Sequence, residues 1–249
     1  MFKNIFILFI ILLTSGLISA DKCLFRGKCG DFESPFGKYP IPCIVDEEPV
    51  PLSSKSKATL KQLSPELFKT SEPLFCCTDQ QVTDIEGQLS MAKSLMNRCP
   101  SCYANFAKIF FHMTCSPKQS EFLEVTKKKS SPTHPSKEML VSLNYYMTDH
   151  YANETFNSCV NVKFPNGQGS IMNILCGGKS PCTVQNFFDY VGNPVTAPFG
   201  IKFNLGKDSK GLHKPMNATV VSCSEPPVPF SNSSCNCVDC PSKCANNIF

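Results

Sequence analysis

The chain has 249 residues, of which 16 are Cys, 20 are Pro, 20 are Phe and none is Trp. Hydrophobic residues make up 42% and charged residues only 18%, a balance that argues against a disordered chain. The net charge of +4 is too small for a nucleic-acid-binding surface, and the basic residues are scattered along the chain. We therefore expect one or two folded domains and no nucleic-acid partner.

The first twenty residues predict a secretory signal peptide. Lys3 supplies the positive start, Ile5 to Leu13 is an unbroken apolar run, and Ala20 is the small residue that signal peptidase prefers at its cut. No later apolar run approaches the ~20 residues that a membrane span needs. We predict a signal peptide over residues 1–20 and a single cysteine-rich domain over residues 21–249, exposed to the secretory pathway.

The cysteines follow from that compartment. All sixteen lie after residue 20, and an even number in an oxidising environment predicts eight disulfides with no free thiol. Three sequons predict N-glycosylation and therefore exposed surface at Asn153, Asn217 and Asn232.

The first half of the domain has one clear helical pattern. Residues 21–45 predict a loop-rich, cross-linked start, and the polar residues 46–58 predict a surface excursion. Over residues 78–99, apolar positions recur at helical spacing, with Thr78 or Asp79 available as the N-cap. A second helix is expected to begin at Pro100, to end at Ser116-Pro117, and to form a cross-linked pair with the first.

The second half is less regular. Residues 126–137, which include three consecutive lysines, predict a solvated loop, and a third helix is expected over about 138–160. Thr183 is positioned to cap a short helix, residues 201–205 alternate as a strand, and residues 224–234 form a Pro/Ser-rich linker before the last four cysteines.

No sequence motif indicates catalysis. The four histidines sit in no hydrolase, protease or nucleotide-binding pattern, and a cysteine nucleophile needs a free thiol. In a secreted chain, the Cys99-x-x-Cys102 pair predicts structural disulfides rather than a metal site. We expect no enzyme activity, no metal and no cofactor. The many phenylalanines fit either a filled core or a disulfide-held apolar cavity of a binding module.

The cysteine spacing carries a family resemblance. Cys76-Cys77, the pair Cys99 and Cys102, and Cys115-Ser-Pro, together with the blocks RCPSCYANFAKIFFHMTCSPKQSEFLEV (98–125), KCLFRGKCG (22–30), LCGG (175–178), APF (197–199) and CNCVDCPSKC (235–244), resemble the luminal N-terminal domain of the Niemann-Pick type C1 sterol transporters. The resemblance covers essentially all of residues 21–245.

The resemblance implies a fold and a disulfide map. The implied fold is α+β, a disulfide-rich and mostly helical single domain with a small mixed β-sheet around an enclosed apolar pocket, distantly like folate receptors. The implied pairs are Cys23–Cys76, Cys29–Cys43, Cys77–Cys115, Cys99–Cys235, Cys102–Cys159, Cys176–Cys182, Cys223–Cys240 and Cys237–Cys244. The family usually has one more bridge, and its two positions here are Ser64 and Phe111, so both partners are absent together.

The resemblance also implies sterol-binding residues. Gln81 matches a glutamine that hydrogen-bonds the sterol hydroxyl. The other implied sterol-binding residues are Phe25, Tyr39, Ile85, Gln88 and Phe110 around the pocket, with Ile174, Leu175, Pro198, Phe199 and Ile201 at its entrance. Two positions depart from the family pattern. Pro42 stands where a second hydroxyl-binding asparagine is expected, with Tyr39 as a candidate substitute, and Lys28 replaces an acidic residue.

The expected function is therefore non-catalytic binding of cholesterol or a related sterol, as a luminal or extracellular module for intracellular or intestinal sterol transport. The implied partners are a soluble sterol carrier of the Niemann-Pick type C2 kind and, if this chain is a fragment, the membrane domain of the same protein. The implied location is the lysosomal or endosomal lumen or the cell exterior, secreted if the chain is complete. The alternatives are a folate- or vitamin-type carrier, disfavoured by the missing tryptophans, and a cysteine-rich receptor ectodomain.

Overall fold

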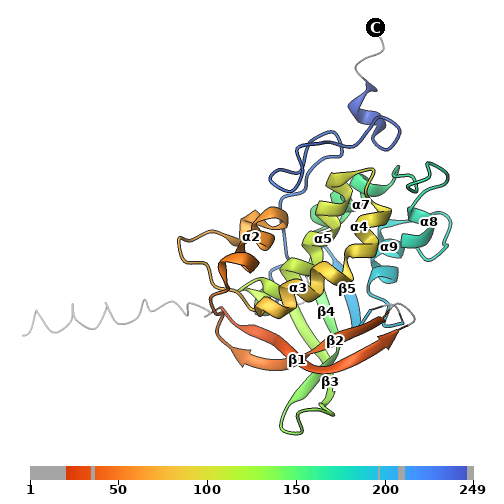
Figure 1. Cartoon of the computed structure of the whole chain (residues 1–249). Coiled ribbons are helices and arrows are strands. Elements are labelled where there is room, and N and C mark those ends of the chain that lie inside the picture. Colours follow the sequence, from red (N-terminus) through yellow and green to blue (C-terminus); the bar gives the residue numbers. More distant parts are fainter. Residues whose placement is uncertain (1–20, 35–36, 196, 207–210, 246–249) are drawn as a thin grey trace, which may run out of the picture.

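The computed structural model describes residues 21–34, 37–195, 197–206 and 211–245, so the predicted signal peptide lies outside the described residues. Figure 1 shows an α+β fold in which helices gather on one side of a long β-hairpin. This is the fold class that we expected. Within the described ranges, no helix combines the length and apolar character that crossing a bilayer requires.

Within the described residues the sheet has five strands, with bounds β1 (Cys23–Ser34), β2 (Gly37–Glu47), β3 (Leu123–Ser130), β4 (Glu138–Met147) and β5 (Gly200–Leu205). Their order is β1-β2-β4-β3, and β5 pairs with β4 as its parallel neighbour. The two halves of the sheet meet where Cys43 pairs with Met139. Strands β1 and β2 cross beneath the helices (Figure 1).

The hairpin corrects our expectation of loops over residues 21–45. The register of β1 against β2 shifts twice, between Cys23 and Phe25 and again between Arg26 and Gly30. Such bulges break the period-2 alternation by which a strand is predicted from sequence. Gly27 lies in the second irregular stretch with a φ of 67°, a conformation that favours glycine.

The helices, including two short 3₁₀ turns, are α2 (Ser54–Leu63), η2 (Pro65–Leu67), α3 (Asp79–Gln88), α4 (Ser90–Leu95), α5 (Pro100–Cys115), α6 (Gln119–Phe122), α7 (Asp149–Cys159), α8 (Met172–Leu175), α9 (Val184–Val191) and η3 (Pro241–Lys243). The helix expected over 78–99 is two helices, since the chain breaks at Leu89 between Gly87 and Ser90, residues of low helix propensity. The surface excursion expected over 46–58 ends where Ser53 caps α2. The helices after Pro100 and Thr183, and the strand over 201–205, are confirmed.

The loop expected over 126–137 is confirmed only for residues 131–137, which connect two strands, and the first half of the helix expected over 138–160 is wrong. Residues 123–130 form β3, whose three lysines are exposed as expected but on a strand, and residues 138–147 form β4. Leu140, Leu143 and Met147 fit helical spacing, but Leu143, Tyr145 and Met147 also alternate, and β3 and β5 supply hydrogen-bond partners on both sides. Only α7, capped by Thr148, is helical as predicted.

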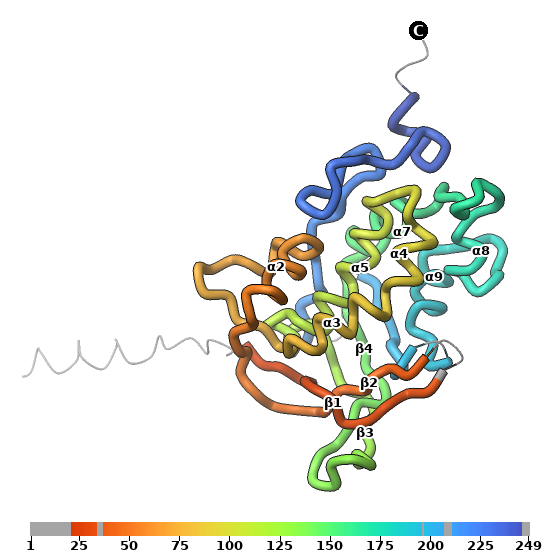
Figure 2. Tube along the Cα trace, viewed as in Figure 1, coloured from red at the N-terminus to blue at the C-terminus, as the bar shows by residue number. Residues whose placement is uncertain are grey.

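Helix α5 runs through the centre of the fold and contacts α2, α3 and α7. Fourteen of its sixteen residues are buried, so its polar side chains need internal partners. The Asn105 amide exchanges hydrogen bonds with the backbone of Val221 and also reaches Ser158. Figure 2 traces how the C-terminal segment returns past the helices to the last cysteines, where Cys235 is bonded to Cys99.

A buried charged cluster, which we call the Glu66 cluster, joins η2 and the C-terminal segment to α5. Oε1 of Glu66 lies 2.9 Å from Nε2 of His112 and 3.3 Å from Nζ of Lys108, and Lys108 also donates to the carbonyl of Thr219 at 2.5 Å. Burial opposes ionisation of Glu66, but the hydrogen bond and charge of His112 and the Lys108 ammonium outweigh it, so the pKa of this carboxyl is lowered.

The sixteen cysteines form eight disulfides, and these join the same pairs that the resemblance implies. The two positions of the family's further bridge, Ser64 and Phe111, are both fully buried. Ser64 directly precedes η2 and Phe111 lies in α5, so the Glu66 cluster joins, without a covalent bond, the two segments that the further bridge would join.

Candidate functional site

An apolar cavity of about 530 Å³ lies between the β1–β2 hairpin, the helices and β5. That volume falls within the range of about 300–1,000 Å³ typical of small-molecule sites. All eleven residues that the resemblance implied line the cavity: Phe25, Tyr39, Gln81, Ile85, Gln88, Phe110, Ile174, Leu175, Pro198, Phe199 and Ile201. The structure therefore gathers residues that span nearly 180 positions of sequence around one space.

Pro42, which the resemblance placed at the head-group position, also lines the cavity. Further lining residues were missed: Gly27, Pro40, Asp84, Leu89, Met91, Ala92, Leu95, Phe106, Met113, Thr114, Tyr190, Val191 and Ala197. Helical spacing was the signal that could have found several of them. Asp84 lies three residues after Gln81 on α3, while Phe106 and Met113 lie four before and three after Phe110 on α5. Four others, Leu89, Met91, Ala92 and Leu95, lie at and after the break between α3 and α4. Their place in the lining depends on that break, which the sequence pattern did not predict.

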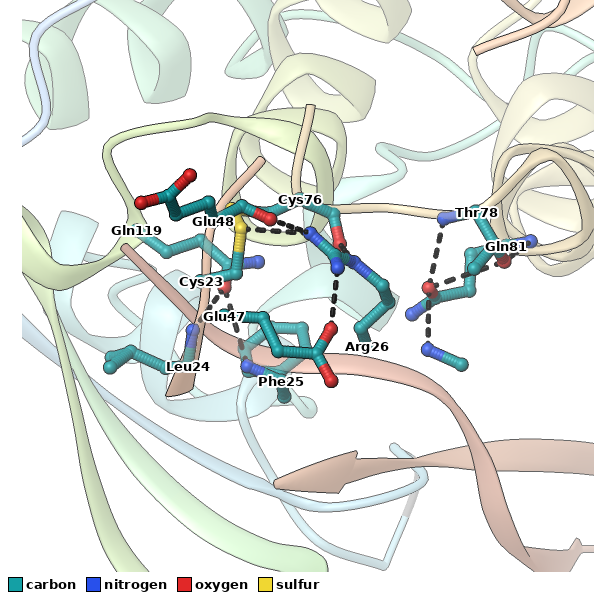
Figure 3. A network of polar contacts seen from close by, with 11 residues as sticks. Cys23, Leu24, Phe25, Arg26, Glu47, Glu48, Cys76, Thr78, Gln81 and Gln119 are labelled. Carbon is teal, nitrogen blue, oxygen red and sulfur yellow. Dashed lines mark hydrogen bonds and ion pairs between the residues drawn. A yellow bond between two sulfur atoms is a disulfide. The ribbon is translucent and has the colours of Figure 1, made fainter. Parts of the chain in front are cut away.

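The amide nitrogen of Gln81, with its N–H donors, is free at the cavity. The residue is 8% exposed, and its Oε1 accepts from the backbone N–H of Gly27 at 2.8 Å and of Thr78 at 3.1 Å (Figure 3). Those two N–H donors fix which end of the amide is oxygen. No hydrogen bond to Nε2 occurs among the described residues. The amide nitrogen is thus available to a polar atom of a ligand.

The start of α3 is fixed from two sides, which positions Gln81. Thr78 and Gln81 form a reciprocal capping box, in which the Thr78 hydroxyl accepts from the N–H of Gln81. Asp79, the first residue of the helix, accepts at 2.6 Å from the hydroxyl of Ser53, the cap of α2. Hydrogen bonds from Ser53 and then Ser56 lower the pKa of the Asp79 carboxyl. The first turns of α2 and α3 are therefore held together.

Arg26 lies on β1 between two cavity residues, Phe25 and Gly27, and its side chain fixes this part of the strand. Its Nε donates to the carbonyl of Cys76 at 2.9 Å, and its two terminal nitrogens reach the Glu47 carboxylate at 2.6 Å and the Glu48 carbonyl at 2.8 Å (Figure 3). The side chain is only 12% exposed. Because Phe25 contacts the cavity and Gly27 donates to Gln81, the guanidinium positions both without entering the cavity itself.

Replacing Arg26 with leucine is expected to lower the free energy of unfolding by about 2 kcal/mol, because two carbonyls and a carboxylate lose a charged donor. The measurement is the denaturant midpoint under non-reducing conditions. The control is Lys22→Leu, which removes an exposed ion pair with Asp46 and is expected to change stability by less than about 0.5 kcal/mol. Equal midpoints for the two variants would contradict the positioning role of Arg26.

The disulfides divide the cavity wall into two parts. Three bridges, Cys23–Cys76, Cys29–Cys43 and Cys77–Cys115, cross-link the hairpin and the segments that flank α3 and end α5. Residues 160–222, which carry α8, α9 and β5, contain only the bridge Cys176–Cys182, and this closes a local loop. The entrance residues Ile174 to Ile201 therefore belong to a wall with no covalent cross-link to the rest of the fold.

The two departures from the family pattern have different surroundings. Pro42 lines the cavity and offers no hydrogen-bonding side chain there. Lys28 does not line the cavity. Its Nζ lies 2.7 Å from Oδ1 of Asp31, and this hydrogen bond is the main reason that the pKa of the Asp31 carboxyl is lowered. Within the described ranges no cluster of histidine, cysteine or carboxylate side chains has the composition of a metal site.

Comparison with known proteins assigns the chain to a family. The family model described as Niemann-Pick C1 N terminus matches residues 20–248. The chain belongs to this Niemann-Pick C1 N-terminal family. It is 29% identical over 95% of its length to NPC intracellular cholesterol transporter 1 of Sus scrofa, and 26% identical over 89% to NPC1-like intracellular cholesterol transporter 1 of Homo sapiens. It is also 28% identical over 74% to NPC intracellular cholesterol transporter 1 homolog 1 of Caenorhabditis elegans.

The chain spans 19%, 17% and 14% of these three relatives, so the likeness concerns their N-terminal part. A Niemann-Pick C1 N-terminal domain with eight disulfides fits the lumen of the secretory pathway or the cell exterior, where thiols are oxidised. The three predicted glycosylation residues, Asn153, Asn217 and Asn232, are all exposed, and their glycosylation stays a prediction.

Proposed function

We propose that this domain binds one sterol molecule, cholesterol or a close relative, without catalysis, as a luminal or extracellular module for sterol transport. The observation that carries the proposal is an apolar cavity with the unpaired amide donor of Gln81 in its wall. A sterol matches this arrangement, since it is a rigid apolar body with one hydroxyl. The names of the relatives, cholesterol transporters from three animals, support this class of ligand.

The proposed pose follows from the cost of burying polar groups. Moving a hydroxyl from water into an apolar site without a hydrogen-bond partner costs a few kcal/mol. We therefore place the sterol hydroxyl next to a free hydrogen-bond donor. Nε2 of Gln81 is that donor, and the aliphatic tail then extends toward the entrance residues around Ile174 and Phe199. A sterol of about 28 heavy atoms gaining roughly 0.3 kcal/mol per atom reaches about 8 kcal/mol, a Kd of about 1 μM.

The same proposal includes the partners that the resemblance implies. The sterol is received from a soluble carrier of the Niemann-Pick type C2 kind and passed to the membrane domain of a longer protein, in the lysosomal or endosomal lumen or at the cell surface. Two apolar lining residues, Met91 and Ile174, are exposed, which supports an entrance that opens toward solvent or a partner. No catalytic step is needed for this role.

A cavity-filling variant tests the proposal. Ala92 lines the cavity from α4, so Ala92→Trp is expected to occupy space that the sterol needs and to weaken cholesterol binding at least about tenfold. Val238→Trp, at an exposed position among the last cysteines, is the control and is expected to bind like the wild type. The measurement is equilibrium binding of radiolabelled cholesterol to the glycosylated, fully oxidised domain.

Three outcomes would contradict the proposal in different ways. Saturable binding that Ala92→Trp leaves unchanged would place the sterol outside the cavity. No sterol binding by a folded wild-type domain would remove the sterol class. Binding of a folate-like heteroaromatic acid in its place would support the vitamin-carrier alternative.

A further inference from the structure

Asp84 places a carboxylate in the wall of an otherwise largely apolar cavity. It lies on α3, is half-buried, and lines the cavity together with Gln81 and Gln88. Its Oδ1 accepts from the exposed amide of Gln80 at 2.9 Å. Among the described residues no hydrogen bond reaches Oδ2. Among the described residues that line the cavity, it is the only anionic one.

Asp84 and Gln81 offer complementary groups at neighbouring positions. Residues three apart on a helix have Cβ atoms about 5–6 Å apart on one face, so both side chains reach the same region of the cavity. Gln81 supplies only a donor, because its Oε1 is already bonded to Gly27 and Thr78. Asp84 supplies only an acceptor, since an ionised carboxylate has no proton to donate. Pro42, in the same lining, supplies neither from its side chain.

A hydroxyl group needs both partners. Its oxygen accepts one hydrogen bond and its proton is donated in another, so a hydroxyl between Gln81 and Asp84 satisfies the free groups of both residues. A ketone accepts from Gln81 but has no proton for Asp84. Covering the carboxylate with such a ligand removes water from a charge and gives it no new partner, which is strongly unfavourable.

We propose that Asp84 is the specificity-determining acceptor of this site, which makes the domain selective for hydroxy-sterols over the corresponding 3-keto-sterols. The inference rests on the proposed sterol-binding function and assigns its head-group chemistry. The hydroxyl oxygen accepts from Nε2 of Gln81, and the hydroxyl proton is donated to Oδ2 of Asp84. Wild-type affinity for cholesterol then exceeds that for cholest-4-en-3-one by about tenfold or more.

The test compares these two ligands across three variants by equilibrium binding. Asp84→Leu removes the acceptor, and the ratio of the two affinities is expected to fall to about one because cholesterol binding weakens. Asp84→Asn replaces the carboxylate with an amide that either accepts from a hydroxyl or donates to a ketone, so the ratio also falls to about one, through better ketone binding. Glu86→Gln, at an exposed position of α3 outside the lining, is the control and keeps the wild-type ratio.

The denaturant midpoint of each variant shows that it is folded. Equal wild-type affinity for the two ligands would overturn the inference, and so would a tenfold preference that persists in both Asp84 variants. In those cases sterol binding itself stands. Absence of binding by either ligand to the wild type would instead overturn the proposed function, and the role of Asp84 with it.

Discussion

Gln81→Glu is expected to weaken cholesterol binding by about 10- to 100-fold while leaving the fold intact. A glutamate at this position still accepts from the N–H groups of Gly27 and Thr78, and glutamate is a favoured partner in a capping box. The amide donor, however, becomes a second carboxylate beside Asp84. One hydroxyl proton satisfies only one of two carboxylates, so the other is covered by an apolar ligand without a partner.

The comparison that isolates this effect is Gln62→Glu, the same substitution at an exposed position of α2. Radiolabelled cholesterol binding is measured for both variants at matched pH and ionic strength. The control is expected to bind like the wild type. If Gln81→Glu binds cholesterol as tightly as the control does, the sterol hydroxyl does not lie against α3, and both the pose and the role of Asp84 are wrong.

Glu66→Gln is expected to lower the free energy of unfolding by about 3 kcal/mol, the largest stability change that we predict. Removing one partner of a buried ion pair leaves the other charge without compensation. Here the side chain of Lys108 is 6% exposed and would retain only the Thr219 carbonyl, while His112, at 8%, would lose its charged partner. The control is Glu138→Gln, whose ion pair with Lys128 is exposed and contributes less than about 1 kcal/mol.

The measurement is denaturant-induced unfolding of the oxidised domain, followed by far-ultraviolet circular dichroism. A Glu66→Gln midpoint within error of the Glu138→Gln midpoint would show that the cluster contributes no more than a surface pair. Such a result would also imply that Lys108 reaches water when Glu66 is neutral.

The contribution of Glu66 to stability should depend on pH. Its folded pKa is lowered below the ordinary value of 4.5, so the folded state binds this proton less readily than the unfolded chain. The stabilisation is therefore present above about pH 4.5 and is lost as the pH falls through the lowered pKa. The stability difference between wild type and Glu66→Gln is expected to be largest above that pH and to narrow below it. A difference that stays constant down to pH 3 would contradict this linkage.

Helix prediction from sequence worked where local signals agreed. Pro100 at the first turn, a long buried face and a terminating Ser116-Pro117 all pointed to α5, and Thr183 marked α9 in the same way. It failed for β4, because Leu140, Leu143 and Met147 fit both periods and the strand depends on neighbours far away in the chain. The β1–β2 hairpin was hidden by bulges around Gly27, which disturb the alternation.

The candidate site was predictable only in part. A resemblance transfers positions one at a time, so it indicated Gln81 and Phe199 but no residue outside the transferred positions. Asp84 is such a residue, because its role depends on a half-buried carboxylate in the cavity lining, which only the structure reveals. Likewise, the sequence shows that the family's further bridge is absent, because its two positions are Ser64 and Phe111. The sequence does not show the Glu66 cluster that joins the same two segments.

The uneven distribution of disulfides has a kinetic consequence. The wall formed by residues 160–222 is held to the rest of the fold by non-covalent contacts, among them the pairing of β5 with β4 and the hydrogen bond from the Gly206 N–H to the Met147 carbonyl. Such contacts open and close by local fluctuation, whereas the Cys23–Cys76 disulfide tethers the hairpin to the segment that precedes α3 and Gln81. The residence time of a bound molecule is then set by how often this one wall opens. A ligand that bridges both walls makes that opening rarer, which lengthens its own residence and slows amide hydrogen exchange in β5.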